Sequence, residues 1–169
     1  MPNWVENEVT ITGDNKILTD IREKYFTEYE DGTIKFDLNK VIPMPEELSS
    51  VSSPNYINGD KMIEKYGVSD WYEWRLANWG VKWNTYPYGD TVVKGNKLLF
   101  QFNSPWGVPS PVFVKLTTLY PNIVIENYVV EESGFFKGNI VYKNGTVDDS
   151  DLEPYDNSED EDDDEDDDE

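Results

Sequence analysis

The separation of charge along this chain limits which part of it can fold. From Asp148 to Glu169 there are 16 acidic residues and no basic ones, and the only large apolar side chains are Leu152 and Tyr155. Such a segment buries too little apolar surface to offset its conformational entropy, and its like charges repel one another. We therefore predict one folded domain over residues 1–147 and a disordered acidic tail over residues 148–169.

The folded part has the composition of an ordinary, mildly acidic domain, with 19 acidic and 14 basic residues before Asp148. The chain has no Cys and no His, which excludes disulfides, thiolate nucleophiles, His-based triads and zinc sites built from these residues. The N-terminus has no signal-peptide pattern, and no apolar run approaches the length of a membrane span. We expect no cofactor, no metal site and no membrane association, and a cytoplasmic location.

Periodicity predicts an alternation of strands and helices. Helix starts are indicated by Asp14 as an N-cap, by Asp70 with Glu73 as a capping box, and by Ser110 with Pro111 as an N-cap and N1 pair. In the first half we expect a strand over 4–11, a helix over 14–29, a strand over 33–38, an extended connector over 41–48, and helices over 60–66 and 71–79. In the second half we expect strands over 81–86, 91–93 and 97–103, a helix over 110–120, and strands over 122–130 and 139–142.

This order favours an α+β fold. It reads strand–helix–strand, then a helical insertion over about 46–79, then strand–strand–helix–strand–strand. A ferredoxin-like antiparallel sheet with helices packed on one face is the simplest topology for two such units.

The tryptophans are the first candidates for a binding surface. Trp79 and Trp83 flank Gly80, and Trp106 lies between prolines and a glycine, where rigid backbone can present a ring to a base, a sugar or a partner's side chain. The same rings are also suited to filling the core between helices and sheet. Asn84 joins the candidate surface, although an Asn commonly bonds local backbone. The candidate partner-binding residues of the body are Trp79, Trp83, Asn84 and Trp106.

The acidic tail is the second candidate. An extended chain advances about 3.3–3.6 Å per residue, and one strand of a duplex carries a phosphate about every 3.4 Å. The tail therefore has the charge spacing needed to compete for a basic DNA- or RNA-binding groove; alternatively, it only keeps the chain solvated. The candidate partner-binding residues of the tail are Asp160, Asp162, Asp163, Asp164, Asp166, Asp167 and Asp168.

Several short motifs together resemble a known family. They are Met1-Pro2-Asn3-Trp4 with Val9-Thr10-Ile11-Thr12-Gly13, Ile42-Pro43-Met44-Pro45-Glu46-Glu47-Leu48, Asn78-Trp79-Gly80-Val81-Lys82-Trp83-Asn84, the segment from Pro105-Trp106 to Pro111, and Tyr120-Pro121. In this order they resemble small phage- and plasmid-encoded proteins with a YubB-type ferredoxin-like domain, over about residues 1–143. The resemblance implies that fold and a mobile-element origin. The family has no established reaction, so the resemblance supplies no catalytic residues.

These observations favour a non-enzymatic phage or mobile-element protein that binds and inhibits a host protein with a basic surface. The expected target is a nucleic-acid-handling defence factor such as a nuclease, inhibited by nucleic-acid mimicry through the acidic surface and tail. Direct binding of nucleic acid is not expected, because basic residues are sparse. The alternative is a small-ligand or nucleotide-binding module that uses the Trp-rich surface.

An enzyme that relies on carboxylates alone is a third class. Its candidate residues would be Glu6, Glu8, Glu73, Asp90, Glu126, Glu131 and Glu132. None of them has a spacing that singles it out, so we assign no catalytic residue.

Overall fold

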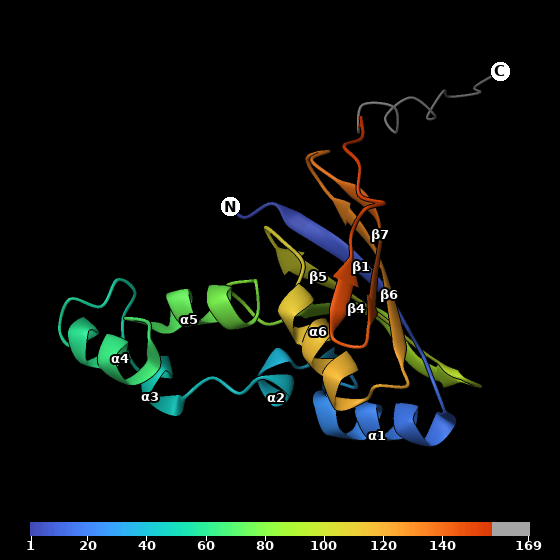
Figure 1. Ribbon diagram of the computed structural model, residues 1–169, viewed down its shortest axis with the longest axis horizontal. Coiled ribbons are helices and arrows are strands. Elements are labelled where there is room, and N and C mark those ends of the chain that lie inside the picture. Colours follow the sequence, from blue (N-terminus) through green and yellow to red (C-terminus); the bar gives the residue numbers. More distant parts are fainter. Residues whose placement is uncertain (157–169) are drawn as a thin grey trace.

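The protein is organised around one six-stranded antiparallel sheet, seen in a computed structural model that describes residues 1–156 (Figure 1). The strand order is β4-β5-β1-β6-β7-β8. The strands are β1 (Trp4–Thr12), β4 (Tyr86–Lys94), β5 (Lys97–Pro105), β6 (Val124–Glu131), β7 (Lys137–Lys143) and β8 (Thr146–Asp148).

Strand β1 lies in the middle of the sheet and pairs with β5 on one side and β6 on the other. Its side chains alternate, so that Val5, Val9 and Ile11 are buried while Glu6 and Glu8 are exposed. Helices α1 (Asn15–Tyr25) and α6 (Ser110–Leu119) cover the buried side (Figure 1). The opposite side of the sheet is left uncovered by these helices.

The topology is the ferredoxin-like one predicted from the sequence. The elements β1, α1, β4, β5, α6 and β6 follow one another along the chain, and their strands lie in the order β4-β5-β1-β6. Strands β7 and β8 extend the β6 edge. The second strand of this motif is β4, however, and the strand expected over 33–38 lies outside the main sheet. The insertion between α1 and β4 therefore covers residues 26–85 rather than about 46–79.

A small hairpin of β2 (Phe26–Glu28) and β3 (Ile34–Phe36) replaces the expected second strand. Helix α1 begins after its N-cap Asp14 as predicted, but it ends at Tyr25 and not near Tyr29. The chain turns extended at Phe26 because its ring packs edge-on against Phe100, 5.0 Å between centroids. Phe36 stacks on Phe113 of α6 at 5.6 Å. The hairpin thus closes the core beneath the sheet.

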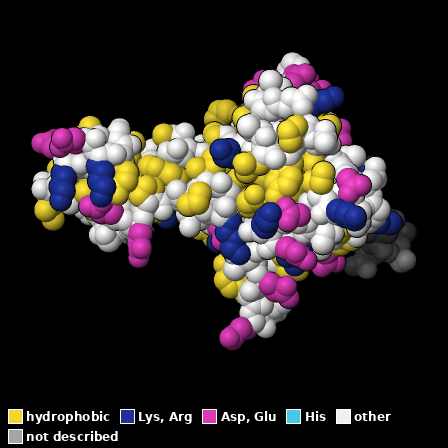
Figure 2. All heavy atoms as spheres, turned by 60° about the horizontal axis from the view of Figure 1, so that its bottom comes forward, with side chains coloured by type: hydrophobic (Ala, Val, Ile, Leu, Met, Phe, Trp, Pro, Cys, Tyr) yellow, Lys and Arg dark blue, Asp and Glu magenta, His cyan; other side chains and the backbone are white. Residues whose placement is uncertain are grey.

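The rest of the insertion forms an arm that projects sideways from the sheet (Figure 1). It contains α3 (Glu46–Ser49), α4 (Gly59–Tyr66) and α5 (Trp71–Asn78), and it follows the short helix α2 (Leu38–Val41), which the sequence analysis did not predict. Asp70 caps α5 by accepting a hydrogen bond from the Glu73 amide at 3.0 Å, as its capping box predicted. Figure 2 shows hydrophobic side chains exposed along the arm.

The strand expected over 81–86 does not form before Tyr86. Residues 81–85 are held instead by bonds from side chains: Arg75 donates to the Lys82 carbonyl at 3.1 Å, and Asn84 accepts from the Leu38 amide at 3.0 Å. Among residues 1–156, every helix is too short or too polar to cross a bilayer.

The folded domain extends past the boundary predicted at Val147. Strand β8 pairs with β7, and the backbones of Glu153 and Lys137 exchange hydrogen bonds of 2.8 and 3.0 Å. The Tyr155 hydroxyl donates to the Glu131 carbonyl at 2.6 Å. The first part of the acidic segment is therefore packed, because Leu152 and Tyr155 supply apolar side chains that contact the domain.

This packing predicts different effects for two truncations. Removing residues 157–169 is expected to leave the free energy of unfolding nearly unchanged. Removing residues 148–156 as well is expected to lower it by roughly 2–4 kcal/mol, since several hydrogen bonds and the burial of Leu152 are lost. Urea denaturation of the two truncated proteins measures the difference, and equal midpoints would contradict it.

The aromatic contacts of Phe36 predict a large effect of its removal. Phe36→Ala should destabilise the protein by about 3–5 kcal/mol, because the side chain is buried against four other phenylalanine rings. Phe135→Ala is the control, since Phe135 is 70% exposed, and it should change stability by less than about 0.5 kcal/mol. Thermal denaturation followed by circular dichroism compares them.

Candidate partner-binding site

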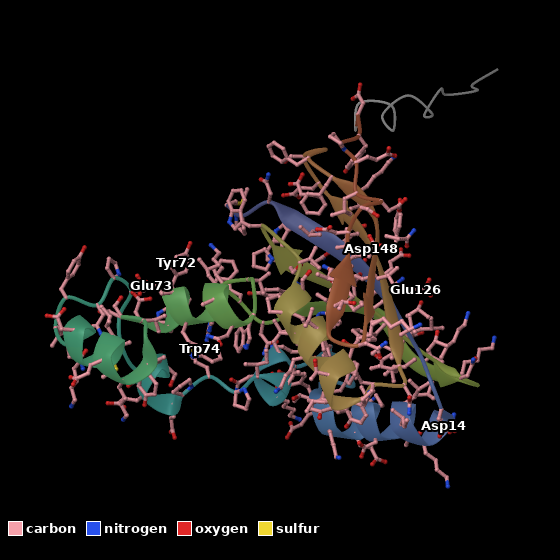
Figure 3. The ribbon with its side chains drawn as sticks, viewed as in Figure 1. Asp14, Tyr72, Glu73, Trp74, Glu126 and Asp148 are labelled. Atoms are coloured by element: carbon pink, nitrogen blue, oxygen red, sulfur yellow. The ribbon has the colours of Figure 1, made fainter. Side chains whose placement is uncertain are left out.

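The uncovered side of the sheet presents a group of carboxylates. Glu6 and Glu8 project from β1, Glu126 from β6 and Asp90 from β4, and all four are exposed. Figure 3 labels Glu126 on its strand. Glu8 and Asp90 line one shallow groove of about 310 Å³ with Gln101. We call the surface formed by Glu6, Glu8, Asp90 and Glu126 the acidic sheet face.

The strand register spreads these charges without pairing them. Glu6 lies opposite Asn103 and Val130, and Glu8 lies opposite Gln101 and Tyr128. No carboxylate is directly opposite another, which limits the repulsion between like charges on neighbouring strands.

The lysines on this side lie at its margins. Lys97 is at the β4–β5 turn, and Lys137 and Lys143 are on β7. The Lys137 ammonium lies over the Tyr155 ring, 5.0 Å from its centroid. The centre of the face is therefore negative, and this local field favours a cationic partner.

Tyrosines stand between the carboxylates. Tyr128 is exposed beside Glu8, and Tyr88 pairs with Gln101 in the neighbouring strand. Burial, together with the smaller effect of the negative charges of Glu6 and Glu8, raises the pKa of the Tyr88 hydroxyl to about 12. The Tyr88 hydroxyl has no hydrogen-bond partner within residues 1–156. It is thus a neutral donor held beside two carboxylates.

An aromatic cluster closes one end of the face. The Trp4 ring lies 5.1 Å from Tyr86 and 6.4 Å from Trp83, between centroids. Trp83, one of the candidates from the sequence, is half-buried here, and the Lys82 ammonium covers its ring at 4.0 Å. The structure therefore brings Trp83 next to the acidic sheet face, with part of its ring in contact with other residues of the domain.

Two other candidates hold the fold together. Trp79 is buried, packs edge-on against Trp74 at 5.7 Å and donates from Nε1 to the Ile42 carbonyl at 2.9 Å. Asn84 donates to Asp37 at 2.8 Å and accepts from the amides of Leu38 and Thr85. Trp79 is thus part of the core, which was one of the two interpretations of the tryptophans, the other being a binding surface. Asn84 binds the first amide of α2.

Trp106 is the tryptophan that the fold exposes. It is 57% exposed and has a positive φ of 65°, a conformation that costs free energy for a residue with a Cβ. Its amide donates to the Asn3 carbonyl at 2.7 Å, which holds the strained turn. With Tyr72 and Leu76 of α5 it lines a groove of about 290 Å³. Tyr72 and Trp74 project to opposite sides of α5 (Figure 3).

The tail candidates Asp160, Asp162, Asp163, Asp164, Asp166, Asp167 and Asp168 lie outside the described residues. The carboxylates of the sheet were not among the partner-binding residues predicted from the sequence. The sequence feature that could have identified them is the alternation of Glu6 and Glu8 with apolar residues along a strand. From the sequence, Glu6 and Glu8 were considered only as candidate carboxylates of an enzyme, and no role was assigned to them.

Comparisons with known proteins agree with the topology. The sequence model of a family described as a ferredoxin-like domain in Api92-like protein matches residues 78–168, more than half of the chain. The chain belongs to the Api92-like family. The matched range begins at the end of α5 and includes β4, β5, α6 and β6. A comparison with curated proteins finds no match.

A crystal structure of a protein api92 from Yersinia pseudotuberculosis resembles this Api92-like chain. The two are 14% identical with a TM-score of 0.52, and the alignment covers 92% of this chain and 99% of the other. At this identity the likeness establishes the fold alone.

The environment of Tyr88 gives a testable prediction. Replacing Glu6 and Glu8 by Gln should lower the pKa of Tyr88 from about 12, while burial still keeps it above the usual value near 10. Because this pKa is raised by folding, the stability it contributes is complete below pH 10 and is lost as the pH rises toward 12.

Tyrosine-selective NMR across this range measures the shift. Tyr142 is the control, since burial raises its pKa to about 12 and Glu6 and Glu8 do not contribute. An unchanged pKa of Tyr88 in the double variant would show that the two carboxylates do not act on it.

Proposed function

We propose that this chain is a non-enzymatic protein that binds a host protein through the acidic sheet face, and that it inhibits a nucleic-acid-handling partner by occupying its basic groove. The observation that carries the proposal is the uncovered side of the sheet, where four carboxylates surround Tyr88 and Tyr128. The acidic tail would add long-range attraction to the same partner.

The chemistry of the face suits arginine-rich surfaces. A carboxylate accepts two parallel hydrogen bonds from a guanidinium, and aromatic rings bind the flat face of the same group. Glu8 with Tyr128, and Glu6 with the nearby Tyr86, offer this combination. Since nucleic-acid-binding grooves are lined with Arg and Lys, such a groove is a complementary partner.

The proposal includes a mobile-element origin and a cytoplasmic site of action. Its support is the resemblance of the sequence motifs to YubB-type proteins of phages and plasmids. A host nuclease of a defence system would be the target that such an element needs to inhibit.

A capture experiment tests the proposal. The immobilised protein is incubated with host lysate at about 0.15 M salt, where weak charge contacts are partly screened. Basic nucleic-acid-binding proteins should be retained, and duplex DNA should release them by competition. Glu6→Gln, Glu8→Gln and Glu126→Gln combined should reduce retention at least about tenfold, the effect of losing a few partly desolvated charge contacts.

The matched control is the triple variant Glu23→Gln, Glu30→Gln and Glu64→Gln. These residues are exposed but lie on α1, in the β2–β3 turn and on α4, away from the acidic sheet face. Both variants change the net charge by the same amount. Equal losses of retention would therefore show that only net charge matters, and would contradict binding through the acidic sheet face. Removal of residues 157–169 separately measures the contribution of the tail.

A further inference from the structure

A cleft on the other part of the molecule lies where the arm joins the body. It has a volume of about 370 Å³, within the range of small-ligand sites. Its walls come from three elements: Arg75 of α5, Glu46 of α3, and Asp37 and Asn39 at the start of α2. The cleft does not include the residues of the acidic sheet face.

Arg75 is held in a fixed position at this cleft. Its guanidinium carbon lies 4.9 Å from the Trp71 ring centroid and 5.1 Å from that of Trp79. One terminal nitrogen donates to the Lys82 carbonyl at 3.1 Å. The two rings and this bond orient the flat guanidinium without the help of a carboxylate.

The charge of Arg75 is left without an opposite charge. Within residues 1–156 it forms no ion pair, and its Nε is buried without a hydrogen-bond partner. Burial lowers the pKa of this guanidinium, which is the sign of a partly desolvated cation. A partly buried charge without a counter-ion costs free energy, and an anionic ligand bound to the guanidinium would offset that cost.

The carboxylates of the same cleft are also unpaired with Arg75. Asp37 accepts from Thr27, the Asn39 amide and Asn84, all neutral donors, at 2.8–3.0 Å. Glu46 is exposed at the start of α3. The cleft thus holds one cation and two anions that do not neutralise one another.

We infer that this cleft binds a small zwitterion, with its carboxylate on Arg75 and its ammonium group on the Asp37 and Glu46 side. This is the chemistry of an amino acid. A phosphate is a poorer fit, because its second negative charge would be repelled by the two carboxylates. The inference does not depend on the proposed function, which concerns a different surface.

NMR of the arginine Nε–H groups tests the inference directly. The chain has two arginines, Arg22 and Arg75, so the spectrum contains an internal control. Arg22 lies near Glu28, 3.6 Å between nitrogen and oxygen, and away from the cleft. The full-length protein is titrated with glycine, sodium acetate, sodium phosphate and sodium chloride at constant ionic strength and neutral pH.

Glycine should shift the Arg75 Nε–H signal in a saturable manner while the Arg22 signal stays in place. Its affinity should exceed that of acetate about fivefold, the contribution of one partly exposed ion pair. Sodium chloride should have no saturable effect. Tighter binding of acetate or phosphate than of glycine would overturn the assignment to a zwitterion.

Variants add a second readout through the fluorescence of the tryptophans beside the guanidinium. Arg75→Lys keeps the charge but removes the flat group and should abolish the glycine response, whereas Arg22→Lys should retain it. An Arg75 signal that does not respond to any of the probes would show that Arg75 only packs against Trp71 and Trp79. That result would leave the capture experiment on the acidic sheet face unaffected.

Discussion

The position of β1 at the centre of the sheet determines most of this structure. It is hydrogen-bonded along both edges, so its register with β5 and with β6 must be correct at the same time. Since side chains alternate along a strand, a slip by one residue would bury Glu6 and Glu8 and expose Val5 and Val9. The same alternation that builds the core therefore also fixes the carboxylates on the uncovered side.

A buried chain of polar groups reinforces this register. Asn127 of β6 donates to Asn7 of β1 at 2.9 Å, and Asn7 donates to Ser104 of β5 at 2.9 Å. The Ser104 hydroxyl donates in turn to the Gly107 carbonyl at 2.6 Å, next to Trp106. Buried amides tolerate few alternative partners, so these bonds favour a single alignment of the three strands. They also connect that alignment to the strained turn that exposes Trp106.

The parts of the fold that could be predicted from sequence are those with local signals. Alternation identified β1 and β5, and Asp14, Asp70 and Pro111 identified the starts of helices. Residues 33–38 alternate like a strand of the main sheet, yet they contain only β3, the second strand of the small hairpin that packs on the phenylalanine cluster. Nothing local separates these outcomes, because the contact with Phe100 and Phe113 is made by distant parts of the chain.

The C-terminal boundary of the domain also could not be predicted correctly, in this case from amino-acid composition. The excess of acidic residues and the small number of apolar ones placed the boundary at Asp148, whereas Leu152 and Tyr155 pack beside β7. Two apolar side chains are enough to order a short segment when a sheet edge already offers backbone partners.

The candidate site could be predicted in kind but not in position. Aromatic and acidic residues were expected to bind a partner. Whether a tryptophan is buried or exposed, however, depends on which residues from distant parts of the sequence pack against it. Trp79 is covered by Ile42 and Trp74, and Trp106 is not covered. Arg75 gave no sequence signal at all, since its lack of a carboxylate partner is a property of the assembled cleft.

The junction between arm and body makes that cleft a fixed feature. Helix α5 ends at Asn78, and Gly80 follows its C-cap with a φ of 79°, which suits a residue without a Cβ. A Cβ there would lie 3.0 Å from Pro111 at the start of α6 and 3.2 Å from the Val108 carbonyl. The base of the arm is therefore packed directly against the body, and Arg75 is bonded across the same junction to Lys82. A cleft formed between such closely packed elements needs little reorganisation to receive a ligand, which lowers the entropic cost of binding.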